Sequence, residues 1–495
     1  MKLVFENEQI EGGIFMKKET TQNGLNRRDF LKAGGVGTLA LTLGSTGILS
    51  LGSNVLADSA DNPTSGFGGY GPLVPDPNGI LDLPQGFHYK IISEEGKPMT
   101  NGTAIPGAFD GMAAFEGPNN TTVLVRNHEL GTSATNPVIG TNPYSSAAVG
   151  GTTTLIINNA RNVVKEYVSS SGTIRNCAGG ATLWGTWLTC EETRSSTHGY
   201  VFEVDPLDPE NELSRTPIKD MGRFSHEACA IDPATGYVYL TEDASPSYLY
   251  RFIPNDTSKK PGALQKGGKL YAAAIEEIAS PKASTFKTGQ TIGIVWKELN
   301  PDLCREDAKA QGCIEFKKLE GAFFQAGVFW FDDSSAGEKS LGRIYRYIPA
   351  TNSLELFYEA TDRELMESPD NICMTPWGDL WFAEDGSGND RIMGITPEGN
   401  IYPFANNRLS GSELAGPIFS PDGKTLFVNI QTPGKTFAIW GPFARSNSAR
   451  AREMSYSSPG KLFAPNVSDK LKSFAENQGI SVLEAAAFER HGVKI

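Results

Sequence analysis

The hydrophobic pattern of this chain repeats: short runs of aromatic and β-branched residues follow a turn signal and end in oxygen-bearing side chains. Runs of this form lie at residues 119–129 (NNTTVLVRNHE), 184–192 (WGTWLTCEE), 237–243 (YVYLTED), 379–385 (DLWFAED) and 424–431 (KTLFVNIQ). Gly, Pro or Asn residues come before each run, and such residues separate strands. The pattern predicts β-strands of one kind, each ending in Glu, Asp, Asn, Gln or His.

A second kind of strand follows the first. Its copies lie at residues 199–206 (GYVFEVDP), 247–254 (SYLYRFIP), 343–349 (RIYRYIP) and 391–399 (RIMGITPEG). Two strand types that alternate along a chain are typical of β-propeller blades. We predict an all-β fold: a propeller of about six blades over 80–495, at roughly 70 residues per blade, with long inter-strand loops such as 255–315. A short helical segment is expected near the C-terminus, with Ser468 as its N-cap.

The oxygen-bearing strand ends have a consequence for function. The innermost strand of each propeller blade runs along the central channel, so the same end of equivalent strands converges on the axis. Carboxylates packed there without cations would repel one another strongly. Oxygen ligands without a histidine cluster favour hard cations such as Ca²⁺ and Fe³⁺ over a zinc site. The alternative is that each acidic pair is a solvated turn, since Asp, Asn and Glu are common at strand ends.

The N-terminal region has the features of an export signal. Residues 26–35 (NRRDFLKAGG) hold a twin-arginine motif, an apolar stretch follows over 36–51, and a small-residue cleavage site lies at 55–57 (VLA). The apolar stretch is too short and too rich in glycine for a membrane anchor. We therefore expect a signal peptide with an N-terminal extension over 1–57, a linker over 58–79, and a mature protein in the periplasm or outside the cell.

Composition narrows the partners and the chemistry. The net charge of −13 argues against nucleic acid or an anionic membrane as a partner.

Six cysteines are too few for a disulfide scaffold, and Cys304 with Cys313 is the expected pair. Cys177 differs, because it lies in a polar, glycine-rich loop just before a predicted strand. Without a nucleophile elbow, a phosphate-binding glycine loop or an H-E-x-x-H motif, the sequence favours metal-assisted hydrolysis over covalent serine catalysis.

Several longer motifs carry a family resemblance. They lie at residues 110–115 (DGMAAF), 125–129 (VRNHE), 176–192 (NCAGGATLWGTWLTCEE), 222–228 (GRFSHEA), 239–244 (YLTEDA), 368–372 (SPDNI) and 416–434 (GPIFSPDGKTLFVNIQTPG). Together they resemble the PhoX-type alkaline phosphatases over nearly all of the mature chain. That family is exported by the twin-arginine translocase, folds as a β-propeller, and hydrolyses phosphate monoesters at a cluster of ferric and calcium ions. The resemblance implies Fe³⁺ and Ca²⁺ as cofactors and small phosphate esters as substrates.

The same resemblance implies roles for individual residues. Cys177 would be an iron-ligating thiolate, and the carboxylate ligands of iron and calcium would include Glu242, Glu320 and Asp370. Further candidate ligands are Glu129, Glu192, Glu227, Glu384 and Asp385. Lys318 and Glu192 are the candidate catalytic side chains. Lys318 stands where an arginine would clamp the substrate phosphate, and lysine supplies the charge without the bidentate fork.

Two other functions fit the same pattern. One is a calcium-dependent propeller lactonase or phosphotriesterase without iron, and the other is a non-catalytic propeller whose calcium is structural. Cys177 distinguishes the phosphatase interpretation from these two alternatives, because a calcium-only site has no use for a thiolate. Under each reading we expect a monomer.

Overall fold

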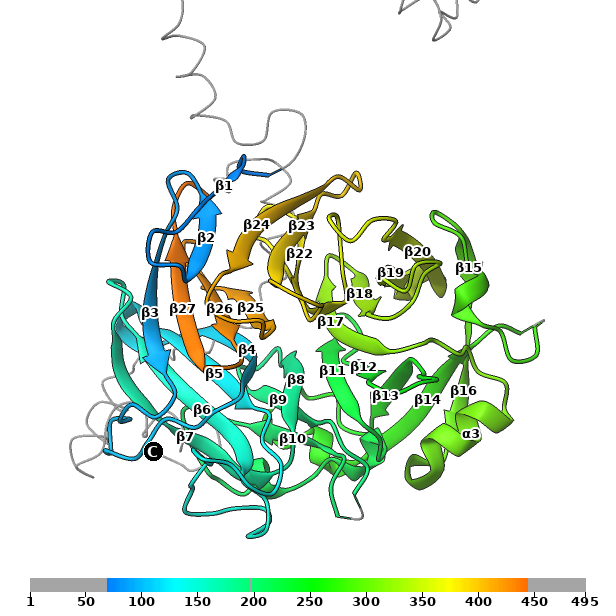
Figure 1. Cartoon of the computed structure of the whole chain (residues 1–495). Coiled ribbons are helices and arrows are strands. Elements are labelled where there is room, and N and C mark those ends of the chain that lie inside the picture. The colour runs from blue at the N-terminus through cyan, green and yellow to red at the C-terminus, as the bar shows by residue number, and fades with distance from the viewer. Residues whose placement is uncertain (1–68, 196, 277, 444–495) are drawn as a thin grey trace, which may run out of the picture. The chain divides into compact units, whose positions relative to one another are not determined.

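Six antiparallel sheets stand around a common axis and form a six-bladed β-propeller (Figure 1). The computed structural model describes residues 69–195, 197–276 and 278–443, all within one compact unit, Ser59–Ile495. The prediction of an all-β propeller with about six blades is confirmed. The predicted signal peptide and C-terminal helical segment lie outside the described residues.

The first three blades follow the chain outward from the axis. Blade one holds β4 (Phe109–Glu116), β5 (Thr122–His128), β6 (Gly150–Ile157) and β7 (Val163–Thr173). Blade two holds β8 (Asn176–Ala181), β9 (Trp187–Glu191) and β10 (Val201–Val204). Blade three holds β11 (His226–Ile231), β12 (Val238–Glu242), β13 (Tyr250–Pro254), β14 (Gly268–Ala274) and β16 (Val295–Leu299).

The last three blades gain strands from elsewhere in the chain. Blade four holds β17 (Leu319–Gln325), β18 (Val328–Asp333), β19 (Arg343–Ile348), β20 (Ser353–Glu359) and β15 (Thr291–Gly293). Blade five holds β21 (Pro369–Met374), β22 (Leu380–Glu384), β23 (Arg391–Ile395), β24 (Ile401–Asn407), β2 (Leu81–Pro84) and β1 (Leu73–Val74). Blade six holds β25 (Leu414–Phe419), β26 (Leu426–Ile430), β27 (Lys435–Trp440) and β3 (His88–Glu94).

The N-terminal strands close the ring. β3 pairs with β27 in blade six, and β2 pairs with β24 in blade five, so the start of the domain completes its last two blades. Aromatic rings seal this joint: the centroids of Phe87 and Phe404 lie 5.0 Å apart, and those of Phe404 and Trp381 lie 4.2 Å apart. Part of the segment predicted as a linker, 58–79, belongs to this joint, because β1 pairs with β2.

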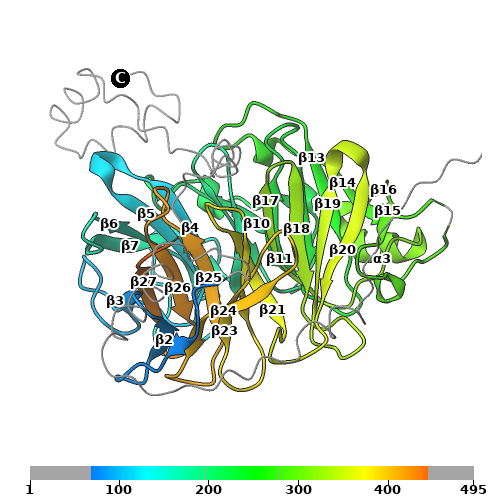
Figure 2. The same ribbon diagram turned by 90° about the horizontal axis from the view of Figure 1, so that it is seen from above.

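One short α-helix, α3 (Cys304–Ala310), occurs in the part of the chain that the structure describes. It lies at the edge of the ring beside β16 (Figure 1 and Figure 2). Cys304 begins this helix and Cys313 follows it, and both are buried, free thiols in the core of blade three. The structure does not form the predicted disulfide between them.

Every inner strand has a register shift near its start, where it pairs with the second strand of its blade. The shifts fall between Phe109 and Met112, Asn176 and Gly179, His226 and Cys229, Leu319 and Ala322, Pro369 and Ile372, and Ala415 and Ile418. Two residues of the inner strand then face one residue of the partner strand, which is the geometry of a β-bulge. A bulge turns a side chain away from the regular pleat, and bulges often lie next to active sites.

Small residues at these bulges let neighbouring blades approach closely. A Cβ atom at Gly321 would lie 2.2 Å from the carbonyl oxygen of Asp370, and one at Gly416 would lie 2.7 Å from that of Asp110. Both glycines also line a mostly apolar cavity of about 200 Å³. Five of the six inner strands contribute Gly or Ala to its lining, and β21 contributes Asn371 and Ile372. The inner strands are thus packed backbone to backbone around the axis.

We expect Gly321→Ala to lower the free energy of unfolding by about 2–3 kcal/mol, because the added methyl group overpacks this contact. Urea denaturation measures the change. Gly293→Ala is the matched control, since a Cβ at that strand residue meets nothing within 4 Å. Equal midpoints for the two variants would contradict the close approach of β17 and β21.

Candidate metal centre

Three positions recur in all six blades, where the inner strand begins and the second strand ends. The residue after the second strand donates its amide to the carbonyl of the residue before the inner strand, at 2.9–3.2 Å in every blade. We call the residue before the inner strand the entry position: Ala108, Arg175, Ser225, Lys318, Ser368 and Glu413. The inner position is the second residue of the inner strand: Asp110, Cys177, Glu227, Glu320, Asp370 and Ala415. The exit position follows the second strand: Glu129, Glu192, Asp243, Ser334, Asp385 and Gln431.

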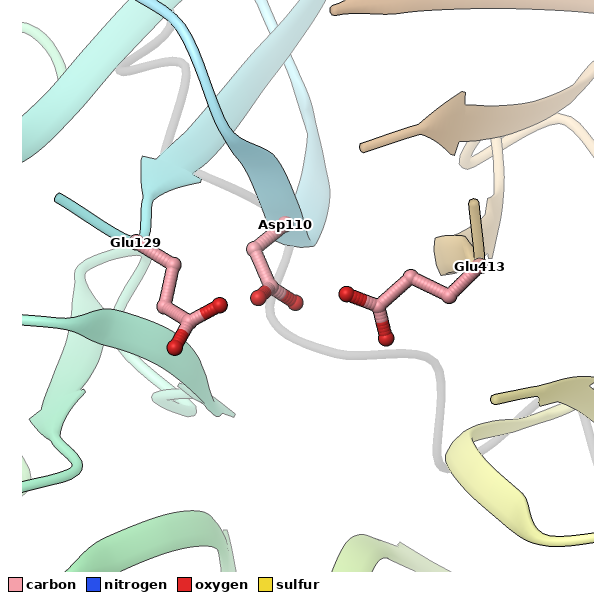
Figure 3. Close-up of side chains that lie close together, drawn as sticks. All are labelled: Asp110, Glu129 and Glu413. Atoms are coloured by element: carbon pink, nitrogen blue, oxygen red, sulfur yellow. The ribbon is translucent and has the colours of Figure 1, made fainter. Parts of the chain in front are cut away.

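These positions bring carboxylates together in three groups among the described residues, with the oxygens of each group within 4.8 Å of one another. Group one is Asp110, Glu129 and Glu413, which point toward one another in Figure 3. Group two is Glu192, Glu227 and Asp243. Group three is Glu227, Glu320 and Asp370, so Glu227 belongs to two groups. Each group combines residues of neighbouring blades, which places all three around the axis.

Burial and mutual repulsion raise the pKa of carboxyl groups in groups two and three. Burial and then Asp243 raise the pKa of Glu192 to about 8, and burial and then Asp385 raise the pKa of Asp370 to about 7. Burial and the neighbouring carboxylates hold the pKa of Glu227 well above its usual range. Without cations, the folded protein must therefore protonate these groups or tolerate their repulsion.

The donor set fits hard cations. All three groups offer carboxylate oxygens, which suit calcium and ferric ions, and within the described residues no histidine belongs to a group. A bound cation offsets the repulsion and returns the carboxyl groups to their charged form. The three groups are thus a site whose charge a cation would balance.

The stability of the metal-free protein is expected to fall as the pH rises from about 5 to 8. Glu192 and Asp370 have folded-state pKa values of about 8 and about 7, above their unfolded values, so the stability they contribute at low pH is lost through this window. Chemical denaturation at several pH values, in the presence of a chelator, measures the fall. The same series with added cations is the control and should show a shallower fall. A chelated protein with pH-independent stability would contradict the carboxylate groups.

Two basic side chains from entry positions contact these groups. Lys318 lies 2.5 Å from a Glu320 oxygen and 3.4 Å from an Asp243 oxygen, and so joins groups two and three. Arg175 pairs with Glu129 at 2.6 Å and with Glu192, and so joins groups one and two. The candidate catalytic residues Lys318 and Glu192 therefore lie at the same site, although no ion pair joins them in the described structure.

Cys177 holds the inner position of blade two. Its thiol donates to the carbonyl of His226 at 3.2 Å, which places it against the neighbouring inner strand. Burial, and then the charges of Glu227 and Glu192, hold the pKa of this thiol well above its usual range. The thiol lies within the electrostatic reach of groups one and two, but it is not a member of any of the three groups.

The structure does not bring two of the predicted ligands, Glu242 and Glu384, to the groups. Both lie one residue before an exit position, and the alternation of side chains along a strand turns them into the blade. Glu242 pairs with Arg305 and accepts hydrogen bonds from the hydroxyl of Tyr250 and a backbone amide. Glu384 pairs with Arg391 at 2.7 Å. Their neighbours, Asp243 and Asp385, occupy the exit positions instead.

The remaining predicted ligands lie at the recurring positions. Glu129, Glu192, Glu227, Glu320 and Asp370 are members of the three groups. Asp385 holds the exit position of blade five. After burial, its charge is the largest cause of the raised pKa of Asp370. Sequence reasoning did not select Asp110, Asp243, Glu413 or Arg175. Asp243 and Asp110 lay in motifs already recognised, whereas Glu413 precedes a strand with no acidic repeat and left no signal.

The fold and the site define a β-propeller protein with a carboxylate-lined site at the axial ends of its inner strands. The model of the alkaline phosphatase PhoX family matches residues 68–434. The chain belongs to this family, whose members are metal-dependent phosphomonoesterases. A search of curated proteins found no match.

Solved structures with the same fold include a Pseudomonas fluorescens PhoX in complex with vanadate, a transition-state analogue. The two chains share 19% identity, with a TM-score of 0.59 over 76% of this chain and 98% of the other. A Xanthomonas campestris gluconolactonase aligns with 11% identity and a TM-score of 0.41, over 76% of this chain and 99% of the other. At 19% identity the likeness to the Pseudomonas structure concerns the fold alone.

The export signal is also confirmed, because a twin-arginine signal model matches residues 24–44. This signal points to export beyond the cytoplasm. Among the described residues, no helix is long and apolar enough to cross a membrane.

Proposed function

We propose that this protein hydrolyses phosphate monoesters at a centre of ferric and calcium ions held by the three carboxylate groups. The observation that carries the proposal is the set of three groups, two of which share Glu227, formed at positions that the same backbone pairing repeats in each blade. Three adjacent groups can hold several cations close together, as a dianionic phosphoryl group requires.

The residues that would hold the ions follow from their positions. The carboxylate ligands are the members of the three groups together with Asp385. Cys177 is the proposed iron ligand, because it is the soft donor at an inner position and ferric iron accepts a thiolate where calcium does not. The raised pKa of its thiol means that metal binding must release the thiol proton. Glu242 and Glu384 are left out of this set, because arginines already hold them.

The protein's own groups bind and orient the substrate. Bound ferric and calcium ions supply Lewis acidity toward the phosphoryl group. Lys318 keeps its charge, because Glu320 and Asp243 raise the pKa of its ammonium group against the effect of burial. It is about one-third exposed, so it can reach a phosphoryl oxygen as a point charge. Glu192 of blade two is the proposed acceptor for the proton of the attacking water.

Substrate comparison tests the proposal. Protein exported through the twin-arginine route is assayed with 4-nitrophenyl phosphate, bis(4-nitrophenyl) phosphate and a δ-lactone. We expect rapid hydrolysis of the monoester, little of the diester, none of the lactone, and loss of activity with a chelator. Preference for the lactone would favour a calcium-only hydrolase. Inactivity toward all three, with calcium bound, would favour a structural propeller.

A further inference from the structure

Arg175 holds the entry position of blade two, which is the position that Lys318 holds in blade four. The amide of Glu192 donates to the Arg175 carbonyl at 2.9 Å, as that of Ser334 does to the Lys318 carbonyl at 2.9 Å. The Arg175 amide donates in turn to the carbonyl of Leu130 at 2.8 Å. Its backbone has a φ of 51°, in the left-handed region that non-glycine residues rarely adopt. The backbone of Arg175 is thus held from both sides in an uncommon conformation that aims its side chain at the site.

Both of these entry-position cations contact group two. Arg175 pairs with Glu192 of this group, and Lys318 pairs with Asp243 of the same group. Among the described residues, these are the two basic side chains with an ion pair to a member of the three groups. An anion that approaches group two therefore meets two positive side chains.

The exposure of Arg175 distinguishes it from the two arginines that hold Glu242 and Glu384. Arg305 and Arg391 also pair with strand-end carboxylates, but their side chains are 15% and 16% exposed. The Arg175 side chain is 46% exposed, so much of its guanidinium faces solvent while the rest contacts Glu129 and Glu192.

We propose that Arg175 is a substrate-binding residue that grips the phosphoryl group in bidentate fashion, together with Lys318; this inference rests on the proposed phosphomonoesterase activity. A guanidinium offers two parallel N–H donors to two phosphoryl oxygens, which the lysine ammonium cannot do. Cations bound at groups one and two would balance the charges of Glu129 and Glu192, and the Arg175 donors would then be available to the substrate. The guanidinium of blade two thus supplies the bidentate donor that the lysine of blade four cannot supply.

The test compares Arg175→Met, Arg175→Lys and wild-type protein, each loaded with iron and calcium. For Arg175→Met we expect KM for 4-nitrophenyl phosphate and the inhibition constant of inorganic phosphate to rise together by about 10–100-fold, with metal content unchanged. Arg175→Lys should recover part of this loss. Arg346→Met is the matched control, because Arg346 pairs with Glu355 at 2.9 Å on an outer strand pair of blade four and is 33% exposed.

Two results would overturn the inference. One is an Arg175→Met protein whose KM and phosphate inhibition match those of wild type. The other is loss of bound metal in step with phosphate affinity, which would make Arg175 a support of the cation site. Failure of the proposed function has a different signature: wild-type protein would then neither hydrolyse the ester nor be inhibited by phosphate.

Discussion

Cys177→Ala should abolish the iron-dependent colour of the protein, remove its iron, and lower phosphomonoesterase activity on the order of a thousandfold or more. Thiolate ligation of ferric iron gives visible charge-transfer absorption, and alanine has no donor to replace the sulfur. Calcium should remain bound, because the three carboxylate groups do not include Cys177. Absorption spectra, elemental analysis and turnover of 4-nitrophenyl phosphate measure the three effects on one preparation.

Cys190→Ala is the control for this prediction. Cys190 lies on β9 one residue before the acidic pair of blade two, and its side chain is fully buried in the core of that blade. Its replacement should cost stability through lost packing, about 1 kcal/mol, and leave the iron in place. Equal activity in the Cys177→Ala and wild-type proteins would exclude the thiolate as an iron ligand.

Glu227→Gln should have the second largest effect, since Glu227 is shared by groups two and three. Loss of one carboxylate removes a ligand from both groups, and we expect activity to fall by about a hundredfold to a thousandfold. The melting temperature should change in opposite directions in two states. Without cations it should rise, because burial and neighbouring carboxylates hold the pKa of Glu227 high and glutamine removes that repulsion. With cations it should fall, because binding no longer stabilises the fold as strongly.

Glu384→Gln serves as the comparison. Glu384 is a buried carboxylate of the same chemistry, but it pairs with Arg391 inside blade five. Its substitution should destabilise the protein with and without cations, and the number of bound ions should stay the same. If Glu384→Gln loses ions and Glu227→Gln keeps them, the assignment of ligands to the recurring positions is wrong.

The repeated strand endings predicted the propeller and the acidic axis because both depend on a short-range pattern. Hydrophobic runs with terminal carboxylates occur within single hairpins, and the closure of the ring brings equivalent hairpins together. The pattern could not decide which member of an acidic pair faces the axis. Glu242 and Asp243 are adjacent in sequence, yet the first is held by Arg305 and the second joins group two.

Strand register decides which of two adjacent carboxylates faces the axis. This register is fixed by the β-bulge and by the alternation of side chains along the strand. Glu191 follows the same rule, since it accepts from His198 at 2.6 Å while Glu192 faces the site. Glu413 is harder still to predict, because it comes from the one blade whose inner position is an alanine. Its contact with Asp110 arises only when blades one and six meet.

Elemental analysis of the wild-type protein, exported from a twin-arginine-competent host and assayed for phosphomonoesterase activity, tests the metal centre most directly. We expect iron and calcium together in the purified protein. Activity should be lost when both are removed and recovered when both are restored. A colourless, iron-free protein that hydrolyses phosphate monoesters at full rate would contradict this expectation.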